Sequence, residues 1–343
     1  METDGRAAGT PLWITEADVV SLVDLADAIA ALEEGLRLEA RGEAENLVKT
    51  HVEWGGGHTL HAIGAVFPGA GLAGTKTWAH TAGGATPLLV LFDSHTGRLK
   101  AIVEAFALGQ LRTGAASGVA TKWLAAEDAQ ELAIIGTGKQ ALTQVAAVAA
   151  VRRLARVRVF SPTPEHRRRF AERLRATFPF EVVEAASVAE AVRDAPIVTL
   201  VTRATAPFLA PEMVARGAHV NAVGAIVPSR AEFEPALLAR CHTVAVDSLP
   251  QVRELSREFR EYYGSGRGAW EAVTPLCRVV ARGRPRPPEA DVTLFKAMGM
   301  GISDLAVGRE VYARALRAGA GRPIPHPEPA APRLAPATRG SSS

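Results

Sequence analysis

A short glycine-containing segment carries the residue types and spacing that point most directly to chemistry. It follows the apolar run 131–135, precedes a helix-forming stretch, and contains Gly136, Thr137, Gly138, Lys139, Gln140 and Ala141. The first glycine permits a sharp turn, the second lets the backbone approach a pyrophosphate, and the small last residue allows close helix packing. Free N–H groups at the helix start would bind the anion. The order of strand, turn and helix predicts dinucleotide binding rather than a turn with only a structural role.

The residues after the next predicted strand select the cofactor. An Asp or Glu about twenty residues past the glycines would bind the ribose hydroxyls of NAD. Here the strand 156–160 runs into Ser161, Pro162 and Thr163, with no carboxylate, and Arg167 lies about one helical turn on. Two hydroxyls and a guanidinium suit a 2′-phosphate, so the sequence favours NADP(H) over NAD(H). The alternative is that the basic run 166–169 is only a solvated helix face.

Alternating elements surround this motif. Helices are expected at 139–151, 164–177 and 187–194, and strands at 156–160, 181–183, 197–202, 218–223 and 243–247. Such alternation predicts βαβ units and a parallel, doubly wound sheet. We therefore expect an α/β protein in which residues 126–289 form a Rossmann-type NAD(P)-binding domain.

The remaining residues predict a second, mixed α+β domain. One or two amphipathic helices are expected at 18–41, followed by short strands broken by glycine between 47 and 92. The runs 88–92 and 99–103 flank an Asp-Ser-His-Thr-Gly turn, as in a hairpin. A helix at 109–124 carries Arg112 near its start. After a Pro/Arg-rich linker at 282–288, the segment 292–318 is expected to be helical.

Composition excludes several other classes of protein. The 343 residues suffice for two domains of about 100–200 residues, and 48% hydrophobic residues can form a sizeable core. A net charge of +3, with basic residues spread along the chain, argues against nucleic acid. Cys241 and Cys277 show neither a disulfide framework nor metal-ligand spacing, so no metal is expected. We find no signal-peptide pattern and no membrane-spanning run, and expect a cytoplasmic protein with flexible tails at 1–11 and 321–343.

From about residue 12 to residue 318 the chain resembles the ornithine cyclodeaminase/mu-crystallin family. The motifs occur in the family's order: Ala-Gly-Thr-Lys-Thr at 73–77, the hairpin at 89–97, Leu-Arg-Thr-Gly-Ala-Ala-Ser at 111–117, the glycine segment at 135–141, Phe-Ser-Pro-Thr-Pro at 160–164, Val-Asn-Ala-Val-Gly-Ala at 220–225, and 293–296 running to 304–306. The resemblance implies a homodimer. Residues 12–125 plus 290–318 would bind substrate and dimerise, and Val223 and Gly224 would join the cofactor site.

The resemblance also implies a reaction. In this family a hydride moves between a nicotinamide and the carbon next to a carboxylate, which becomes an imine. The site therefore needs a cationic clamp for the carboxylate and a positioned proton donor. Arg112 matches the family's substrate-binding arginine, and Lys76 matches a lysine beside the reacting centre. Lys49 stands where many relatives have a second arginine, and His80 is a further candidate acid.

One loop departs from the ornithine-specific members. They carry an aspartate shortly before a proline, where this chain has Ile226, and Ser229 replaces an aspartate common after that proline. Ornithine and lysine carry a distal ammonium group, and binding that group in a closed site without a counter-ion is costly. We therefore expect a reductase or dehydrogenase with an apolar or neutral side-chain pocket, unless Glu104 supplies the missing negative charge. A cyclodeaminase-type ammonia lyase using catalytic NAD, and a non-catalytic mu-crystallin-like NADPH-binding protein, are the alternatives.

Overall fold

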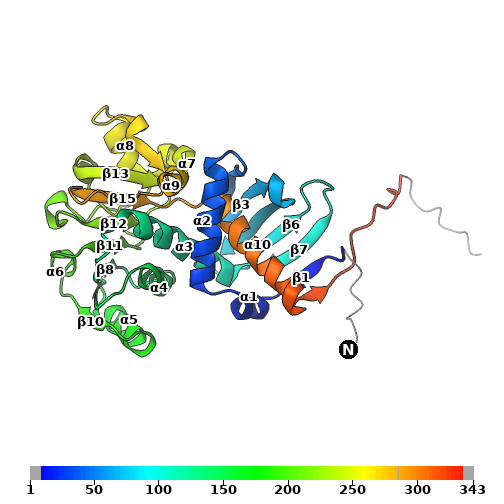
Figure 1. The fold of residues 1–343 in the computed structure, drawn as a ribbon, viewed down its shortest axis with the longest axis horizontal. Helices are drawn as coiled ribbons and strands as arrows, with labels where there is room; N and C mark the ends of the chain where they lie inside the picture. The colour runs from blue at the N-terminus through cyan, green and yellow to red at the C-terminus, as the bar shows by residue number, and fades with distance from the viewer. Residues whose placement is uncertain (1–8, 285, 335–343) are drawn as a thin grey trace, which may run out of the picture.

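Two β-sheets with different strand directions organise residues 9–284 and 286–334, the part of the chain that the computed structural model describes (Figure 1). The first sheet is mostly antiparallel, in the order β16-β1-β7-β6-β4-β3-β2, with β5 beside β4. The second sheet is parallel throughout, in the order β10-β9-β8-β11-β12-β15-β13-β14. The predicted α/β class with a doubly wound sheet is confirmed.

Strands of the first sheet are longer than the glycine-broken pattern suggested, because β2, β3 and β4 each run for ten residues. The hairpin between β6 and β7 is confirmed, with Asp93 accepting the backbone N–H groups of His95 and Thr96. The strands are β1 (Leu12–Ile14), β2 (Glu45–Trp54), β3 (His58–Phe67), β4 (Leu72–Thr81), β5 (Gly84–Ala85), β6 (Leu88–Phe92), β7 (Leu99–Glu104) and β16 (Arg322–Pro323).

Four helices belong with this sheet: α1 (Glu16–Leu22), α2 (Leu25–Ala40), α3 (Phe106–Leu124) and α10 (Gly301–Ala318). Thr15 and Asp24 form capping boxes that divide the first amphipathic stretch into α1 and α2. Helix α10 contacts β3 and β4 closely because its first residue is Gly301, where a Cβ atom would collide with the carbonyl oxygen of Gly64. This close packing places the first turn of α10 against β4.

The second sheet is buried on both faces. Leu132 and Ile134 of β8 pack on one side with α4 and α5, whereas Ala133 and Ile135 pack on the other with α6, α7 and α8. Its strands are β8 (Glu131–Ile135), β9 (Arg156–Phe160), β10 (Glu181–Glu184), β11 (Ile197–Leu200), β12 (His219–Ala222), β13 (Cys241–Val246), β14 (Val273–Pro275) and β15 (Val292–Lys296). Its helices are α4 (Ala141–Val151), α5 (Pro164–Thr177), α6 (Val188–Val192), α7 (Leu249–Leu255), α8 (Arg257–Tyr263) and α9 (Leu276–Arg282). Short 3₁₀ turns lie at Pro68–Ala70, Pro211–Met213, Pro235–Arg240 and Trp270–Ala272.

Two expectations are corrected. Residues 292–296 form β15, between β12 and β13, rather than a helix of the substrate-binding part. All five are buried, so their apolar run lacks the alternation that marks a half-exposed strand. The chain therefore leaves the second sheet after Lys296, and 301–318 alone returns to the first.

The second correction concerns the tail expected at 321–343. Arg322 and Pro323 pair with β1, and Ile324 donates its N–H to the carbonyl of Pro11. Residues 1–8 and 335–343, where flexible ends were also predicted, lie outside the described part. Within the described ranges, no helix is long and apolar enough to cross a membrane, and no cluster of three His, Cys, Asp or Glu residues could hold a metal ion.

A buried polar chain joins the two halves along α3. Asn221 donates to the hydroxyl of Thr121 at 3.0 Å, and His219 contacts Asn221 and Thr293 at 3.1 and 3.0 Å. The Thr293 hydroxyl donates to the carbonyl of Leu124, the last residue of α3. Helix α3 is thereby fixed to β12 and β15, and α9 packs against α2 nearby. The cavity described next lies between elements held together in this way.

Candidate functional site

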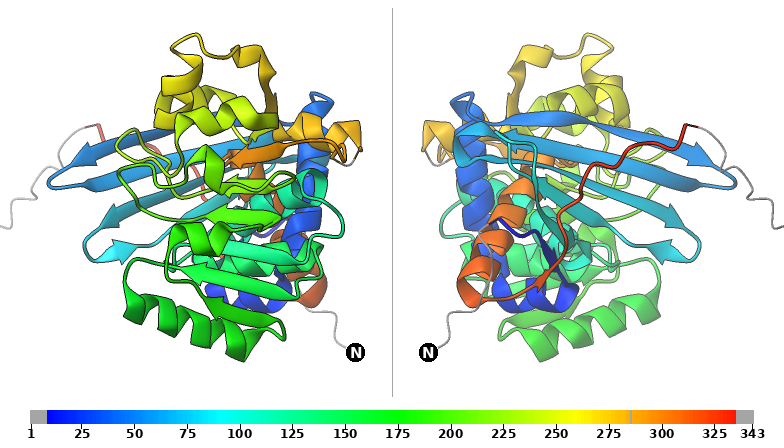
Figure 2. Two further views of the ribbon diagram at one scale, coloured as in Figure 1. Left: turned by 90° about the vertical axis from the view of Figure 1, so that its left-hand side faces the viewer. Right: turned by 90° about the vertical axis from the view of Figure 1, so that its right-hand side faces the viewer.

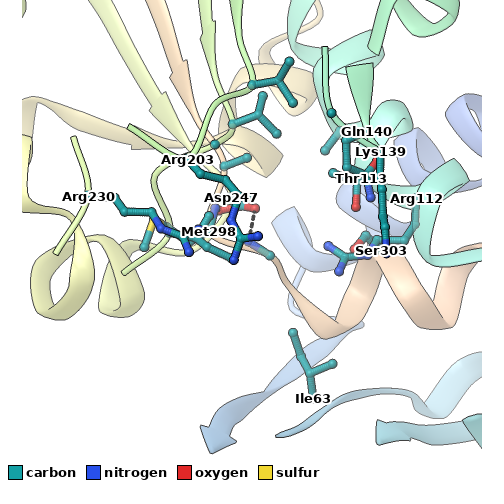
Figure 3. A pocket seen from close by; sticks show the side chains of 18 of the residues that line it. Ile63, Arg112, Thr113, Lys139, Gln140, Arg203, Arg230, Asp247, Met298 and Ser303 are labelled. Carbon is teal, nitrogen blue, oxygen red and sulfur yellow. Dashed lines mark hydrogen bonds between the residues drawn. The ribbon is translucent and has the colours of Figure 1, made fainter. Parts of the chain in front are cut away.

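A cavity of about 560 Å³ lies between the two halves, at the carboxyl ends of β8, β11, β12, β13 and β15. This is the edge of a doubly wound sheet at which ligands bind. Figure 3 shows Arg112 and Ser303 on one side, Arg203 and Arg230 on the opposite side, and Ile63 below. The residues come from β2–β4, α3, α10 and the loops of the second sheet, so neither half forms the site alone.

The glycine segment has the geometry that a dinucleotide requires. Gly136 has φ +114°, and a Cβ atom there would lie 2.5 Å from the Val201 carbonyl oxygen. Gly138 faces open space, since an added Cβ would have no heavy atom within 4 Å. No side chain caps the start of α4 at Gln140, which leaves backbone N–H groups for an anion. The residues present therefore fit a dinucleotide pyrophosphate.

A second groove of about 510 Å³ continues from this turn along the ends of β8 and β9. Gly138, Thr202 and Arg203 line both the groove and the cavity, so the two are continuous. The predicted cofactor residues group here or at the cavity: Gly136, Thr137, Gly138, Ser161 and Thr163 line the groove, and Gly138, Lys139, Gln140, Val223 and Gly224 line the cavity.

Arg167 lies differently from the other predicted cofactor residues. Its guanidinium donates to the Ser161 carbonyl at 3.0 Å and faces the ring of Phe160, and it is not among the groove-lining residues. His166 lines the groove instead. Sequence reasoning passed over His166 because it treated 166–169 as one basic run.

The predicted substrate residues come together at the other end of the cavity. Lys49 and Arg112 line it, and Lys76 lies just beneath, 3% exposed, with its ammonium 5.1 Å from the centre of the Trp78 ring. Asp304, on the first turn of α10, binds both cations. Its Oδ1 accepts the Lys76 ammonium and lies 3.3 Å from Nε of Arg112. His80 also lines the cavity.

Burial changes the proton affinity of these lysines. It lowers the pKa of Lys76 to about 8, and the neighbouring charge of Arg112 acts in the same direction. Burial also lowers the pKa of Lys49, again with Arg112 as the next cause. Lys76 can therefore gain or lose a proton close to neutral pH, as a general acid or base must.

Two acidic residues that the sequence reasoning missed shape the cavity walls. Asp247, which follows β13, lines the cavity and accepts the N–H groups of Met298 and Gly299 at 2.8 and 2.7 Å. Burial raises its pKa. The available signal was its position directly after a buried strand, as with Ser161.

Glu232 is the second missed acid, and it orders two loops of the cavity. It is buried, and accepts the N–H groups of Thr202 at 2.7 Å, Gly224 at 2.8 Å and Ala225 at 3.1 Å. Burial raises the pKa of its carboxyl group. Its side chain thus fixes the chain after β11 to the chain after β12.

The expectation of an apolar or neutral side-chain pocket stays a prediction, because the cavity lining holds both apolar and charged residues. Ile226 lines the cavity as anticipated, but Asp247, Arg203 and Arg230 line it too, from the ends of neighbouring strands. Glu104 does not supply a charge there, because it accepts from the Trp13 indole and the Glu16 backbone. The sequence argument considered one loop, whereas the fold brings together the ends of five strands.

Comparison with known proteins yields consistent relatives. The family model described as ornithine cyclodeaminase/mu-crystallin matches residues 11–319. A Delta(1)-pyrroline-2-carboxylate reductase of Bacillus cereus is 33% identical over 239 residues, 69% of this chain and 73% of that protein. The structure of Thermococcus litoralis Delta(1)-pyrroline-2-carboxylate reductase with NADH and L-proline has a TM-score of 0.85 at 26% identity, covering 91% and 100%. An archaeal alanine dehydrogenase dimer with bound NAD gives 0.85 at 28% identity, covering 92% and 99%.

Proposed function

Because the chain belongs to the ornithine cyclodeaminase/mu-crystallin family and is an NAD(P)-dependent oxidoreductase, we propose that it acts on the imine or amine carbon next to a substrate carboxylate. The observation that carries the proposal is one continuous groove with the glycine turn at one end and Lys49, Lys76 and Arg112 at the other. A reductase of a ketimine or pyrroline-2-carboxylate, or an L-amino-acid dehydrogenase, fits this arrangement.

Each cation has a part in this proposal. Arg112 binds the carboxylate with its planar fork of donors, and Lys49 adds a second positive charge. Lys76 holds the proton at Nζ, and Asp304 orients that ammonium from below. The bound nicotinamide cofactor supplies or accepts the hydride. Glu232 keeps the loops after β11 and β12 at a fixed separation, which positions the reacting groups.

One observation favours a second candidate, the cyclodeaminase-type lyase. Asp247 provides a carboxylate in the cavity despite the isoleucine at 226. Both of its oxygens accept backbone N–H groups, however, which leaves it less able to bind a distal ammonium. The lyase predicts ammonia release with no net change in nicotinamide.

Absorbance of NADPH on mixing the protein with pyrroline-2-carboxylate tests the main proposal. Steady loss of NADPH is expected. If NADPH binds but is not consumed, and ornithine or lysine releases ammonia, the lyase replaces the reductase. If NADPH binds, no ammonia is released from ornithine or lysine, and neither pyrroline-2-carboxylate nor ammonium with pyruvate or oxaloacetate consumes NADPH, the hydride-transfer proposal fails.

The cofactor of this proposal is NADP(H). Support comes from the end of β9, where Ser161, Thr163 and His166 line the groove without a carboxylate and Arg167 stands behind Ser161. A hydroxyl and imidazole surface suits a 2′-phosphate better than a ribose diol, which requires an acceptor. Separate titrations with NADPH and NADH give the test, and tighter NADH would overturn the preference.

The proposal includes a homodimer formed through β2 and β3. The far ends of these strands project beyond the helices (blue in Figure 2). They expose large apolar side chains: Leu47, Val48, Val52, Trp54 and Leu60. Such a patch on an edge strand favours association. Light scattering should give a dimer for the native protein and a monomer for Val52→Glu, whereas a native monomer would refute the proposal.

A further inference from the structure

Arg203 and Arg230 face the cavity from the wall opposite Arg112 (Figure 3). Arg203 follows β11, and Arg230 lies in the loop after β12. Across the described residues, neither guanidinium has a carboxylate within ion-pair distance, whereas Arg112, the third arginine that lines the cavity, lies 3.3 Å from Asp304. The proposed function assigns no role to either of them.

Three other cations at or beneath the cavity already have acidic partners. Lys76 and Arg112 share Asp304, and the buried Lys296 lies 3.6 Å from Glu258. The pKa of Arg230 is lowered by burial and, next, by the charge of Arg203, with the buried Glu232 acting in the opposite direction, so the two guanidinium groups lie near enough to repel. Two like charges on one wall of a cavity favour an anion beside them.

We propose that Arg203 and Arg230 bind a second carboxylate of the substrate, whose first carboxylate is held by Arg112 and Lys49 on the opposite wall. The substrate is then an imino or amino dicarboxylate, and this inference rests on the proposed function. Its size suits a cavity of about 560 Å³ shared with the nicotinamide end of the cofactor.

Phosphate groups of the cofactor are the other anions that could reach these arginines. Two observations favour the substrate instead. Arg203 lines both the cavity and the groove formed by Ser161 and Thr163, but its neighbour Arg230 lines the cavity and is absent from that groove. The glycine turn, with the uncapped start of α4 and Lys139, already offers a site for the pyrophosphate.

Calorimetric titration of the NADP⁺-loaded protein with L-aspartate and L-alanine tests the inference without requiring turnover. Aspartate is expected to bind at least about 10-fold more tightly, because a charge-assisted pair contributes on this order. Arg203→Gln and Arg230→Gln should each weaken aspartate binding about 10-fold and leave alanine within about two-fold. The exposed Arg173→Gln on α5 is the matched control and should change neither.

Three results would overturn the inference. Alanine could bind as tightly as aspartate, the two variants could weaken both amino acids equally, or they could weaken NADP⁺ binding instead, which would assign the arginines to the cofactor. Failure of the proposed function gives a different result. The protein would then not consume NADPH with pyrroline-2-carboxylate, nor with ammonium and either pyruvate or oxaloacetate, whose imines would each take one hydride and one proton. If the protein reduces pyrroline-2-carboxylate and the imine of pyruvate but not the imine of oxaloacetate, the proposed function stands and only the dicarboxylate inference is rejected.

Discussion

Lys76 and Asp304 lie 228 positions apart in the sequence and meet in a buried ion pair beneath the cavity. The same oxygen of Asp304 lies 3.3 Å from Nε of Arg112, so one carboxylate serves the two cations expected to contact substrate. The contact depends on α10 lying directly on β3 and β4 at Gly301. The positions of Arg112 and Lys76, the two residues proposed as substrate clamp and proton donor, are therefore set by one residue of α10.

The pH dependence of imine reduction should report the proton on Lys76. An ammonium donor is protonated below its pKa, so kcat/KM for reduction should fall as the pH rises through about 8. Amine oxidation needs the neutral lysine and should rise over the same interval. Lys76→Met should lower kcat about 100-fold or more and abolish the fall in kcat/KM near pH 8. Lys100→Met, which removes a surface pair with Asp93, is the control and should leave the pH profile unchanged. If the fall in kcat/KM survives in Lys76→Met, Lys76 is not the proton donor.

Replacing Asp304 by Asn should shift the fall in kcat/KM for imine reduction to lower pH. The counter-ion is lost while Arg112 and Lys49 remain, so the neutral form of Lys76 is favoured. Breaking a buried pair also costs about 3 kcal/mol of stability or more, which urea unfolding would measure. Asp291→Asn removes a partly exposed pair with Arg240 and should leave the pH profile unchanged. If the pH at which kcat/KM falls is the same in Asp304→Asn, Asp304 does not stabilise the charged form of Lys76.

Arg112→Ala should chiefly weaken substrate binding. Loss of a bidentate carboxylate contact is expected to raise KM about 10- to 100-fold, with NADPH affinity little changed. Arg112→Lys keeps the positive charge but loses the bidentate geometry of the guanidinium, so its KM should lie between those of the native protein and Arg112→Ala. Steady-state kinetics with a separate NADPH titration distinguish these effects, and unaltered KM in Arg112→Ala would exclude the clamp.

Ser161→Asp should reverse the cofactor preference. A carboxylate at the end of β9 repels a 2′-phosphate and accepts hydrogen bonds from ribose hydroxyls. NADPH affinity should fall about 10-fold or more, while NADH affinity holds or rises. Fluorescence titration of both cofactors against the unmodified protein provides the measurement. Equal losses for both would instead indicate a local disturbance of the groove.

His219 should make stability depend on pH. Burial lowers its folded pKa from 6.5 to about 3. Between these values the unfolded chain binds a proton that the folded chain does not, so the contribution of His219 is complete above about pH 6.5 and declines as the pH falls. The difference in unfolding free energy between the native protein and His219→Gln should shrink from pH 7 to pH 5. A constant difference would show that His219 does not titrate on unfolding.

The sequence patterns predict six of the eight strands of the second sheet, all except β14 and β15, because the signals of those six are local. Apolar runs alternate with helical segments, and the Gly136 turn follows a strand directly, so order and spacing suffice. Lys76 and Arg112 were found through motifs shared with a family. Both methods use residues that are neighbours in the chain.

What sequence reasoning missed is non-local. Asp304, Asp247 and Glu232 act through backbone and side-chain partners that folding brings together from distant segments. Strand β15 was predicted to be helical because all five of its residues are buried, so its sequence lacks the alternation of apolar and polar residues that distinguishes a strand from a helix. Arg203 and Asp247 reach the same cavity for a non-local reason too, since they follow β11 and β13, which the sheet order brings to one edge with β12 and β15 between them.

The order of elements also has a consequence for synthesis on the ribosome. Every strand of the second sheet lies between 131 and 296, so that sheet is complete before α10 is made. The first sheet begins earlier yet lacks the helix that covers β3 and β4 until residue 318 has emerged. The cofactor-binding half can therefore fold first, and the amino-terminal strands must wait, with their apolar face uncovered, for nearly the whole chain.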